Sequence, residues 1–155
     1  MHQVISRLSM LTKLKYVGVG IEDLLEVYKL FIRSCTEYCS VAFHSSLTIE
    51  QSDKLERIQK TCLRVILGEM YVSYSAALEM TGLQTLFSRR EKRCLDFPLK
   101  CLTNNRTSRL FPLKPVHNQD VRENEIFTVN FAKTSTYKKS AIPFCQGLLN
   151  QHFMS

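Results

Sequence analysis

The chain has 155 residues, of which 45% are hydrophobic and 23% are charged, and 21 Lys and Arg against 14 Asp and Glu give a net charge of +7. This composition is too apolar for a disordered chain, and the sequence has neither an apolar stretch long enough to span a membrane nor a secretory signal. We therefore expect an intracellular protein, in nucleus or cytoplasm, whose six cysteines are reduced thiols rather than a disulfide framework.

The first hundred residues predict consecutive amphipathic helices. Apolar residues repeat at helical spacing from residue 5 to residue 14, and Gly18 and Gly20 end this first helix. A second helix begins after Gly20, with Glu22 and Asp23 in its first turn, where carboxylates suit the positive end of the helix dipole. Its apolar positions continue to Phe43, so we expect it to run that far.

The next two helices carry end signals in the sequence. Thr48 and Gln51 have the spacing of a capping box, and Gly68 stands where a C-terminal cap is expected for the third helix. Ser73 and Gly82 bound a shorter fourth helix in the same way.

A fifth helix is expected from residue 86 to about residue 102, with Thr85 as its N-terminal cap. Pro98 lies inside this pattern. Because proline removes a helical hydrogen bond and clashes with the preceding turn, we expect a kink or an early stop there.

The composition changes near Asn104. Residues 104–125 are polar and contain two prolines, which indicates a linker with one apolar anchor at Leu110 and Phe111. Residues 126–132 could form a short strand, and residues 141–150 a last short helix capped by Ser140. The sequence thus predicts a mainly α fold of four to five amphipathic helices in a bundle, divided as a helical domain over residues 1–103, a polar linker over 104–125 and a tail over 126–155.

The residue types that a catalytic or metal site needs are scattered. The four aspartates do not adjoin one another, whereas two-metal phosphoryl transfer requires carboxylates that converge on the ions. The histidines and cysteines lack the paired spacing of a zinc site, so we expect core cysteines, no metal, no cofactor and no small-molecule substrate. A Cys–His nucleophile pair remains open, although no local signature supports one.

Basic residues gather first on the third helix. At about 100° per residue, Lys54, Arg57, Lys60 and Arg64 share an arc of roughly 120° opposite much of the apolar stripe. One interpretation is a basic face along a nucleic-acid backbone. The other is a solvated face held by acid-before-base pairs four residues apart, which would involve Lys54, Arg57 and Lys60 and leave Arg64 as the freer charge.

A second basic cluster, Arg89, Arg90, Lys92 and Arg93, occupies the first turns of the fifth helix, where positive charge opposes the helix dipole. A phosphate there would relieve both the cluster and the unpaired amides. An ordinary solvated face, or a salt bridge to another helix, accounts for the same residues.

Four segments, taken in order, form a recognisable series. They are Leu24–Tyr28 continuing through Glu37-Tyr38-Cys39-Ser40 to His44, then Leu55-Glu56 through Gln59-Lys60 and Arg64 to Gly68, then Gly82-Leu83 to Arg89-Arg90, and finally Ser140–Pro143 with Leu148–Asn150. Together they resemble the C-terminal part of reverse transcriptases from LINE-type, non-LTR retrotransposons, especially jockey-like and CR1-like elements. The resemblance covers the chain from about residue 4 to residue 150.

The resemblance implies a thumb-like helical bundle beside an RNA/DNA primer–template. Arg57, Gln59, Lys60, Arg64, Arg89 and Arg90 match motif positions of the family. The catalytic palm, with its paired aspartates, would lie upstream of Met1 and would be the missing packing partner, so the chain alone is expected not to be an enzyme. The sequence departs from the family pattern at Thr36, Phe43 and Pro98.

Three functions therefore follow as hypotheses. The first is a truncated, non-catalytic C-terminal fragment of such an RNA-directed DNA polymerase, whose nucleic-acid-binding candidates are Arg57, Lys60, Arg64, Arg89, Arg90, Lys92 and Arg93. The second is a standalone basic helical module that binds nucleic acid. The third is a helical protein-interaction domain, which an exposed apolar patch around Tyr38, Phe43 and Leu47 would favour.

Overall fold

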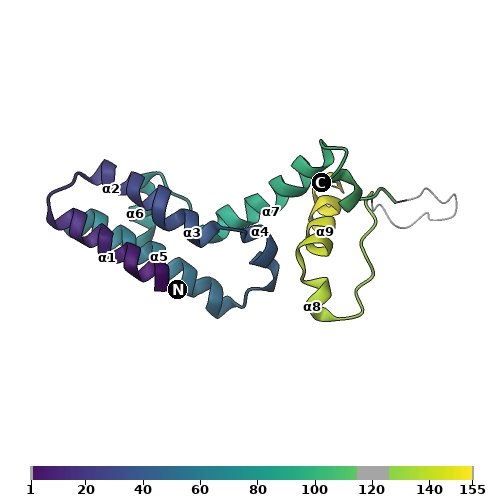
Figure 1. Ribbon diagram of the computed structural model, residues 1–155, viewed down its shortest axis with the longest axis horizontal. Coiled ribbons are helices and arrows are strands. Elements are labelled where there is room, and N and C mark those ends of the chain that lie inside the picture. Colours follow the sequence, from purple (N-terminus) through teal and green to yellow (C-terminus); the bar gives the residue numbers. More distant parts are fainter. Residues whose placement is uncertain (1, 115–125, 155) are drawn as a thin grey trace. The chain divides into compact units, whose positions relative to one another are not determined.

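The computed structural model describes residues 2–114 and 126–154, and this part of the chain is mainly helical, as the sequence predicts, without an extended strand (Figure 1). Contacts divide the chain into two compact units. Unit 1 comprises Met1–Tyr38 and Thr48–Arg89, and unit 2 comprises Cys39–Leu47 and Arg90–Ser155. This division does not follow the predicted boundaries at residues 103 and 125.

The first predicted helix is confirmed as α1 (His2–Tyr16). Its Leu11 is fully buried, and Gly18 follows the helix with a φ of +92°. Glycine reaches this left-handed region without steric cost, which explains why the helix ends here. Within unit 1, α1 packs along α5 (Ile49–Leu67), and the two helices lie side by side in Figure 1.

The second predicted helix begins where expected but changes geometry. α2 (Ile21–Val27) passes into η1 (Tyr28–Arg33), a π-helical segment, and then into α3 (Ser34–Glu37). Leu24, Tyr28 and Ile32 are buried and hold this series of turns against α1 and α5.

The prediction that this helix continues to Phe43 is wrong, because the helix ends at Glu37. Tyr38 has an extended backbone and Cys39 a φ of +51°, after which α4 (Ser40–Phe43) and η2 (His44–Ser46) follow. A left-handed conformation costs a residue other than glycine about 1 kcal/mol. The apolar spacing is the same on both sides of the break, so the pattern alone does not reveal it.

α5 has the predicted capping box and C-terminal glycine. Thr48 Oγ1 accepts a hydrogen bond from the Gln51 amide at 3.2 Å, and Gln51 Oε1 accepts one from the Thr48 amide at 3.0 Å. Gly68 ends the helix with a φ of +57° and begins the short η3 (Gly68–Met70). The α5 side chains that complete the core of unit 1 are Cys62, Leu63, Ile66 and Leu67.

α6 (Tyr74–Thr81) also has its predicted ends. Ser73 Oγ accepts a hydrogen bond from the Ala76 amide at 3.2 Å, and Gly82 has a φ of +63°. Ala77 and Leu83 place this segment on the core of unit 1.

α7 (Leu86–Leu102) continues through Pro98, so the early stop expected there does not occur. Because Pro98 has no amide hydrogen, the Cys94 carbonyl four residues earlier loses its helical donor. The Cys145 thiol, on α9 (Ala141–Met154), donates to this oxygen at 3.5 Å. A contact from a distant part of unit 2 thus replaces the missing bond.

The described residues after 103 belong to unit 2, and the predicted tail packs there against the C-terminal part of α7. Phe111 in the predicted anchor and Phe127 are buried with Cys101 and Leu149, so the C-terminal part of α7 shares a core with α9. Residues 115–125 of the predicted linker lie outside the described residues.

The predicted short strand over residues 126–132 is reduced to a single bridge between Leu113 and Phe127. The Asn150 side chain holds this segment instead, since its Oδ1 accepts from the amides of Ile126 and Phe127 at 3.1 and 2.8 Å and its Nδ2 donates to the Phe127 carbonyl at 3.0 Å. α8 (Ser135–Lys138) and α9 follow, and α9 begins after Ser140 as predicted but extends to Met154. The short η4 (Ser108–Leu110) completes the described elements.

Most of the cysteines are core residues, as the sequence predicts. Cys62, Cys94, Cys101 and Cys145 are buried, Cys35 is half-buried and Cys39 is exposed. Burial raises the pKa of Cys62 and Cys145 to about 12 and that of Cys94 to about 11. These three thiols are therefore protonated at neutral pH and unsuited to nucleophilic chemistry.

Candidate nucleic-acid interface

The predicted basic face of α5 is present in unit 1. Arg57 and Arg64 are exposed and Lys60 is half-buried, on the side of the helix away from Gln59 and Leu63, which are buried. The spacing of three and four residues places the cations in one row along the helix. α5 therefore offers a positively charged row to solvent.

Two tyrosines that follow α5 support this row. The Lys60 ammonium lies 5.0 Å from the centre of the Tyr74 ring, and the Arg64 guanidinium lies 5.3 Å from that of Tyr71. A cation over an aromatic face is attracted to the ring and is held in place by it. A guanidinium stacked in this way keeps its edge N–H groups available to a phosphate.

Of the three acid–base pairs expected along α5, only the Glu50–Lys54 ion pair forms. Lys54 pairs with Glu50 at 2.8 Å, as expected for a solvated helix face. Asp53 and Arg57, both in the described part of the chain, form no ion pair with each other. The expected Glu56–Lys60 pair is likewise replaced by the contact of Lys60 with Tyr74.

Glu56 is used inside unit 1 instead. Its Oε1 accepts a hydrogen bond from the Tyr74 hydroxyl and another, at 3.2 Å, from the Leu86 amide. Burial, reinforced by this carboxylate, raises the pKa of Tyr74. Glu56 thus fixes the tyrosine under Lys60 and satisfies a free amide at the start of α7.

The N-terminus of α7 is not an open phosphate site. Besides the Leu86 amide, the Ser88 amide is satisfied, by Thr85 Oγ1 at 3.1 Å, which confirms Thr85 as the cap. Arg89, proposed from the sequence as a phosphate contact, binds Glu37 through two hydrogen bonds, Nε to Oε1 at 2.5 Å and Nη2 to Oε2 at 3.1 Å. These bonds raise the pKa of the Arg89 guanidinium.

The Arg89–Glu37 pair is largely withdrawn from water. The Glu37 side chain is 3% exposed and that of Arg89 is 25% exposed. Two parallel N–H···O bonds in a fork geometry are the strongest arrangement for such a pair. Of the three alternatives that the sequence leaves open for Arg89, namely a phosphate contact, a solvated face and a salt bridge to another helix, the salt bridge is the one that forms.

The remaining three residues of that basic cluster belong to unit 2. Arg90 is only 1% exposed, and its charge contributes, after burial, to lowering the pKa of His44. Its burial leaves Arg90 no surface to offer a nucleic-acid backbone. Lys92 and Arg93 are exposed, and Lys92 lines a cavity of about 380 Å³ together with His44 and Phe144.

Gln59, a position quoted for the family resemblance, lies in the interior of unit 1. Its Oε1 accepts a hydrogen bond from the Tyr28 hydroxyl at 2.6 Å, and its Nε2 donates to the Gln84 carbonyl at 2.9 Å. Burial raises the pKa of Tyr28. Gln59 therefore ties η1 and the segment that precedes α7 to α5.

The three residues named in the third hypothesis differ in their exposure to solvent. Tyr38 in unit 1 is 76% exposed, whereas Phe43 and Leu47 in unit 2 are half-buried. On η1 of unit 1, Leu30 and Phe31 are exposed as well.

Sequence reasoning missed the two tyrosines beneath the basic row. Tyr71 and Tyr74 lie beyond the turn at Gly68, seven and fourteen residues from the cations that they support. No helical period links positions on opposite sides of such a turn. The sequence does show aromatic residues just after the glycine cap. Their contact with the cations follows from the packing of α6 on α5, which the sequence pattern does not show.

Comparisons of the chain with protein-family models, with curated proteins and with solved structures find no match. Among residues 2–114 and 126–154, no three His, Cys, Asp or Glu side chains gather as metal ligands would. None of the helices described is both long enough and apolar enough to cross a membrane.

Proposed function

We propose that this chain is the C-terminal, thumb-like part of a reverse transcriptase of the LINE-type, non-LTR class, and that α5 in unit 1 holds the RNA/DNA duplex. The observation that carries the proposal is the row of Arg57, Lys60 and Arg64, in which the two arginines are exposed and the Lys60 and Arg64 cations lie over tyrosine rings. The sequence motifs supply the class of enzyme, and the row supplies the contact.

The length of the row suits a nucleic-acid backbone. From Arg57 to Arg64 the helix rises by about 10 Å at 1.5 Å per residue. Successive phosphates of one strand are separated by about 3.4 Å along the duplex axis, so the row can follow two or three of them. Such contacts read charge rather than base sequence, as a polymerase that copies any template requires.

Further support comes from how the motif residues pair in unit 1. Glu37 of the first motif binds Arg89 of the third, and Glu56 of the second motif caps the helix on which Arg89 lies. Gln59 of the second motif binds Tyr28 of the first. Residues that carry the resemblance thus depend on one another in the fold, which gives a physical reason for their order and type.

The chain by itself is proposed to be non-catalytic, because the metal-binding aspartates of the parent class have no counterpart in the motifs that this chain carries. We expect the purified 155-residue protein to incorporate no nucleotide on a primed RNA template with Mg²⁺ or Mn²⁺ present. Primer extension on a gel measures this. Extension that requires the metal and persists through a further purification step would contradict it.

The proposed duplex contact is tested by removing the row. We expect the Arg57→Gln, Lys60→Gln, Arg64→Gln variant to bind an RNA/DNA duplex about tenfold more weakly at low salt, since each exposed charge pair contributes a few tenths to 1 kcal/mol. Fluorescence anisotropy with a labelled duplex measures the affinity.

The matched control removes the same charge elsewhere. Lys13, Lys100 and Arg106 are all exposed and lie outside the row, so replacing these three by glutamine lowers the net charge equally. The control is expected to lose only two- to threefold through long-range electrostatics. Equal losses in the two variants would mean that net charge, and not the α5 row, accounts for binding.

A second candidate, a helical protein-interaction domain, is favoured by the exposed side chains of Leu30, Phe31 and Tyr38 in unit 1. In a polymerase of the proposed class these residues would contact the palm. The two functions are compatible, because the apolar residues and the α5 row use different side chains.

A further inference from the structure

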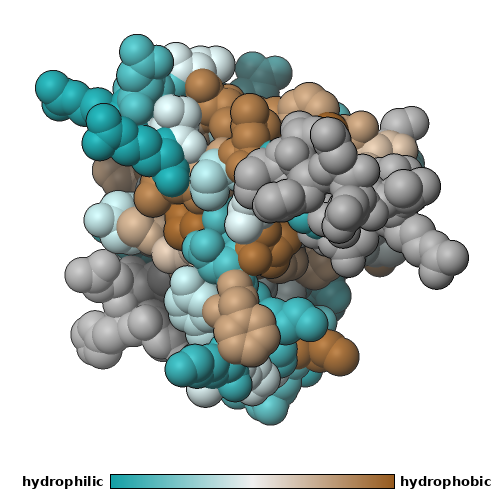
Figure 2. Space-filling view, turned by 90° about the vertical axis from the view of Figure 1, so that its right-hand side faces the viewer, coloured by the Kyte–Doolittle hydropathy of each residue, from teal (hydrophilic) through white to brown (hydrophobic). Residues whose placement is uncertain are grey.

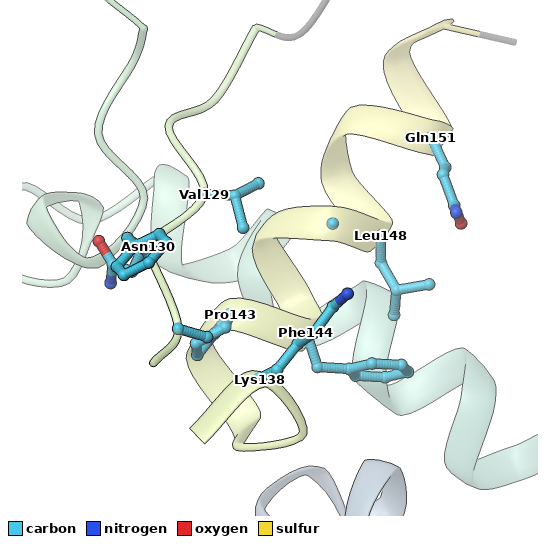
Figure 3. Close-up of a pocket in the computed structure, with 10 residues that line it drawn as sticks. Val129, Asn130, Lys138, Pro143, Phe144, Leu148 and Gln151 are labelled. Atoms are coloured by element: carbon cyan, nitrogen blue, oxygen red, sulfur yellow. The ribbon is translucent and has the colours of Figure 1, made fainter. Parts of the chain in front are cut away.

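Unit 2 contains a groove that the duplex proposal does not use. Its volume is about 520 Å³, within the usual range for sites that bind small molecules. The extended segment of residues 129–132 forms one side and α9 the other, with Lys138 from α8 between them (Figure 3).

The walls of the groove are mostly apolar and partly aromatic. Phe131, Phe144 and Leu148 line it, and Phe131 is 84% exposed. Figure 2, which is coloured by hydropathy, shows hydrophobic side chains at the surface between hydrophilic ones. An aromatic face left open to water offers a stacking platform to a planar ligand.

One cationic side chain, that of Lys138, lines this groove. In Figure 3 the Lys138 side chain extends toward the middle of the labelled residues, beside Phe144 and Leu148. Lys133 follows the lining residue Ala132 in the sequence, and Lys139 follows Lys138. Both lysines are exposed. Residues 126–155 contain no aspartate or glutamate, so no acidic side chain of this segment offsets the lysines.

We propose that this groove binds one unpaired nucleotide of a single-stranded nucleic acid. The base lies against the aromatic and apolar walls, Lys138 binds its phosphate, and Lys133 and Lys139 bind neighbouring phosphates. Lys138 lines an aromatic groove, and two more exposed lysines are adjacent in sequence to its lining residues, which fits a polymer of phosphates better than a lone carboxylate. Base stacking on aromatic side chains is the usual way to hold a single strand. A paired base, stacked inside a duplex, does not present its face in this way.

Gly147 gives a way to close the groove without removing any contact group. It lies on α9 and lines the cavity, and a Cβ added there meets no atom within 4 Å. A Gly147→Leu variant should therefore fill the groove while keeping every lysine and aromatic ring. Because leucine has a higher helix propensity than glycine, α9 is not weakened.

The test compares an oligouridylate of about eight nucleotides with an abasic ribose-phosphate strand of the same length, by fluorescence anisotropy on the full chain. We expect the strand with bases to bind about tenfold more tightly. Gly147→Leu and Phe131→Ser should abolish that difference, whereas Lys138→Gln should weaken the binding of both strands. Controls are Tyr16→Ser, an aromatic residue 93% exposed in unit 1, and Lys100→Gln, an exposed lysine outside the groove.

Two outcomes would overturn the proposal. One is equal affinity for the strands with and without bases, which would leave only charge attraction. The other is an unchanged preference for bases in Gly147→Leu, with circular dichroism showing that the variant is folded.

This site is independent of the α5 row, and the measurements separate the two. Gly147→Leu is expected to leave duplex affinity unchanged, and the triple variant of the row is expected to keep the preference for bases over the abasic strand. If the triple variant keeps its duplex affinity, the α5 proposal fails. If Gly147→Leu keeps the preference for bases, the groove proposal fails.

Discussion

Replacing Arg89 by methionine is expected to lower the free energy of unfolding by about 3 kcal/mol, because it leaves the Glu37 carboxylate in the interior of unit 1 without its guanidinium partner. Methionine keeps much of the apolar stem of arginine, so the loss reports the ion pair more than the packing. Urea denaturation followed by far-UV circular dichroism measures the change.

Lys92→Met is the control for this substitution. Lys92 lies on the same helix, carries the same charge and is exposed, so its replacement should change stability by less than about 0.5 kcal/mol. The Glu37→Gln, Arg89→Met double variant should be more stable than the sum of the two single losses predicts, by at least 1 kcal/mol. An Arg89→Met protein as stable as the Lys92→Met protein would show that the pair contributes nothing to the fold.

Replacing Gln59 by leucine should cost about 3 kcal/mol. The two residues have similar size, but leucine removes both the acceptor for the Tyr28 hydroxyl and the donor to the Gln84 carbonyl. A buried polar group left without a partner loses the free energy of its hydration with nothing in return. Equilibrium unfolding measures the loss, and thermal unfolding should show a correspondingly lower midpoint.

The effect of Gln59→Leu is expected on folding and not on nucleic-acid affinity. Tyr28→Phe removes one of the two hydrogen bonds and should therefore cost less, about 1 kcal/mol. Below the unfolding transition, the folded Gln59→Leu protein should bind an RNA/DNA duplex as tightly as the parent. A variant with unchanged stability and weaker duplex binding would instead place Gln59 in the interface.

Local signals in the sequence predict the helix ends well. The capping box at Thr48, the caps at Ser73 and Thr85 and the glycines at 68 and 82 depend only on residues within one or two turns, and all of them are present. Such hydrogen bonds form wherever the helix itself forms, whatever packs on it. The mainly α class of the fold follows from these signals together with the apolar spacing.

The helix end at Cys39 and the uninterrupted helix at Pro98 are not predicted by the apolar pattern. An apolar pattern continues across Cys39, and only its positive φ shows that the helix stops there. From the sequence alone, Pro98 is expected to interrupt the helix. In the structure the Cys145 thiol, 51 residues from Cys94 in sequence, replaces the donor that the Cys94 carbonyl loses. The contact at Pro98 is tertiary, and a periodicity in the sequence does not contain it.

For the same reason, one part of the candidate site could be predicted from the sequence and the other part could not. The face of α5 could be predicted because a single helix positions Arg57, Lys60 and Arg64 by its own geometry. The cluster from Arg89 to Arg93 could not be assigned, because the burial of Arg90 and the partner of Arg89 depend on segments more than forty residues away. Charge in a sequence thus predicts an interface only where the same element also fixes its exposure.

The salt dependence of duplex binding tests the central claim most directly. The logarithm of the association constant falls linearly with the logarithm of salt concentration, by about 0.9 for each phosphate neutralised. If the α5 row follows the duplex backbone, the Arg57→Gln, Lys60→Gln, Arg64→Gln variant should show a slope smaller by about 2 to 3 than the parent chain. A slope equal to that of the parent would contradict the account, because it would mean that these three cations neutralise no phosphate.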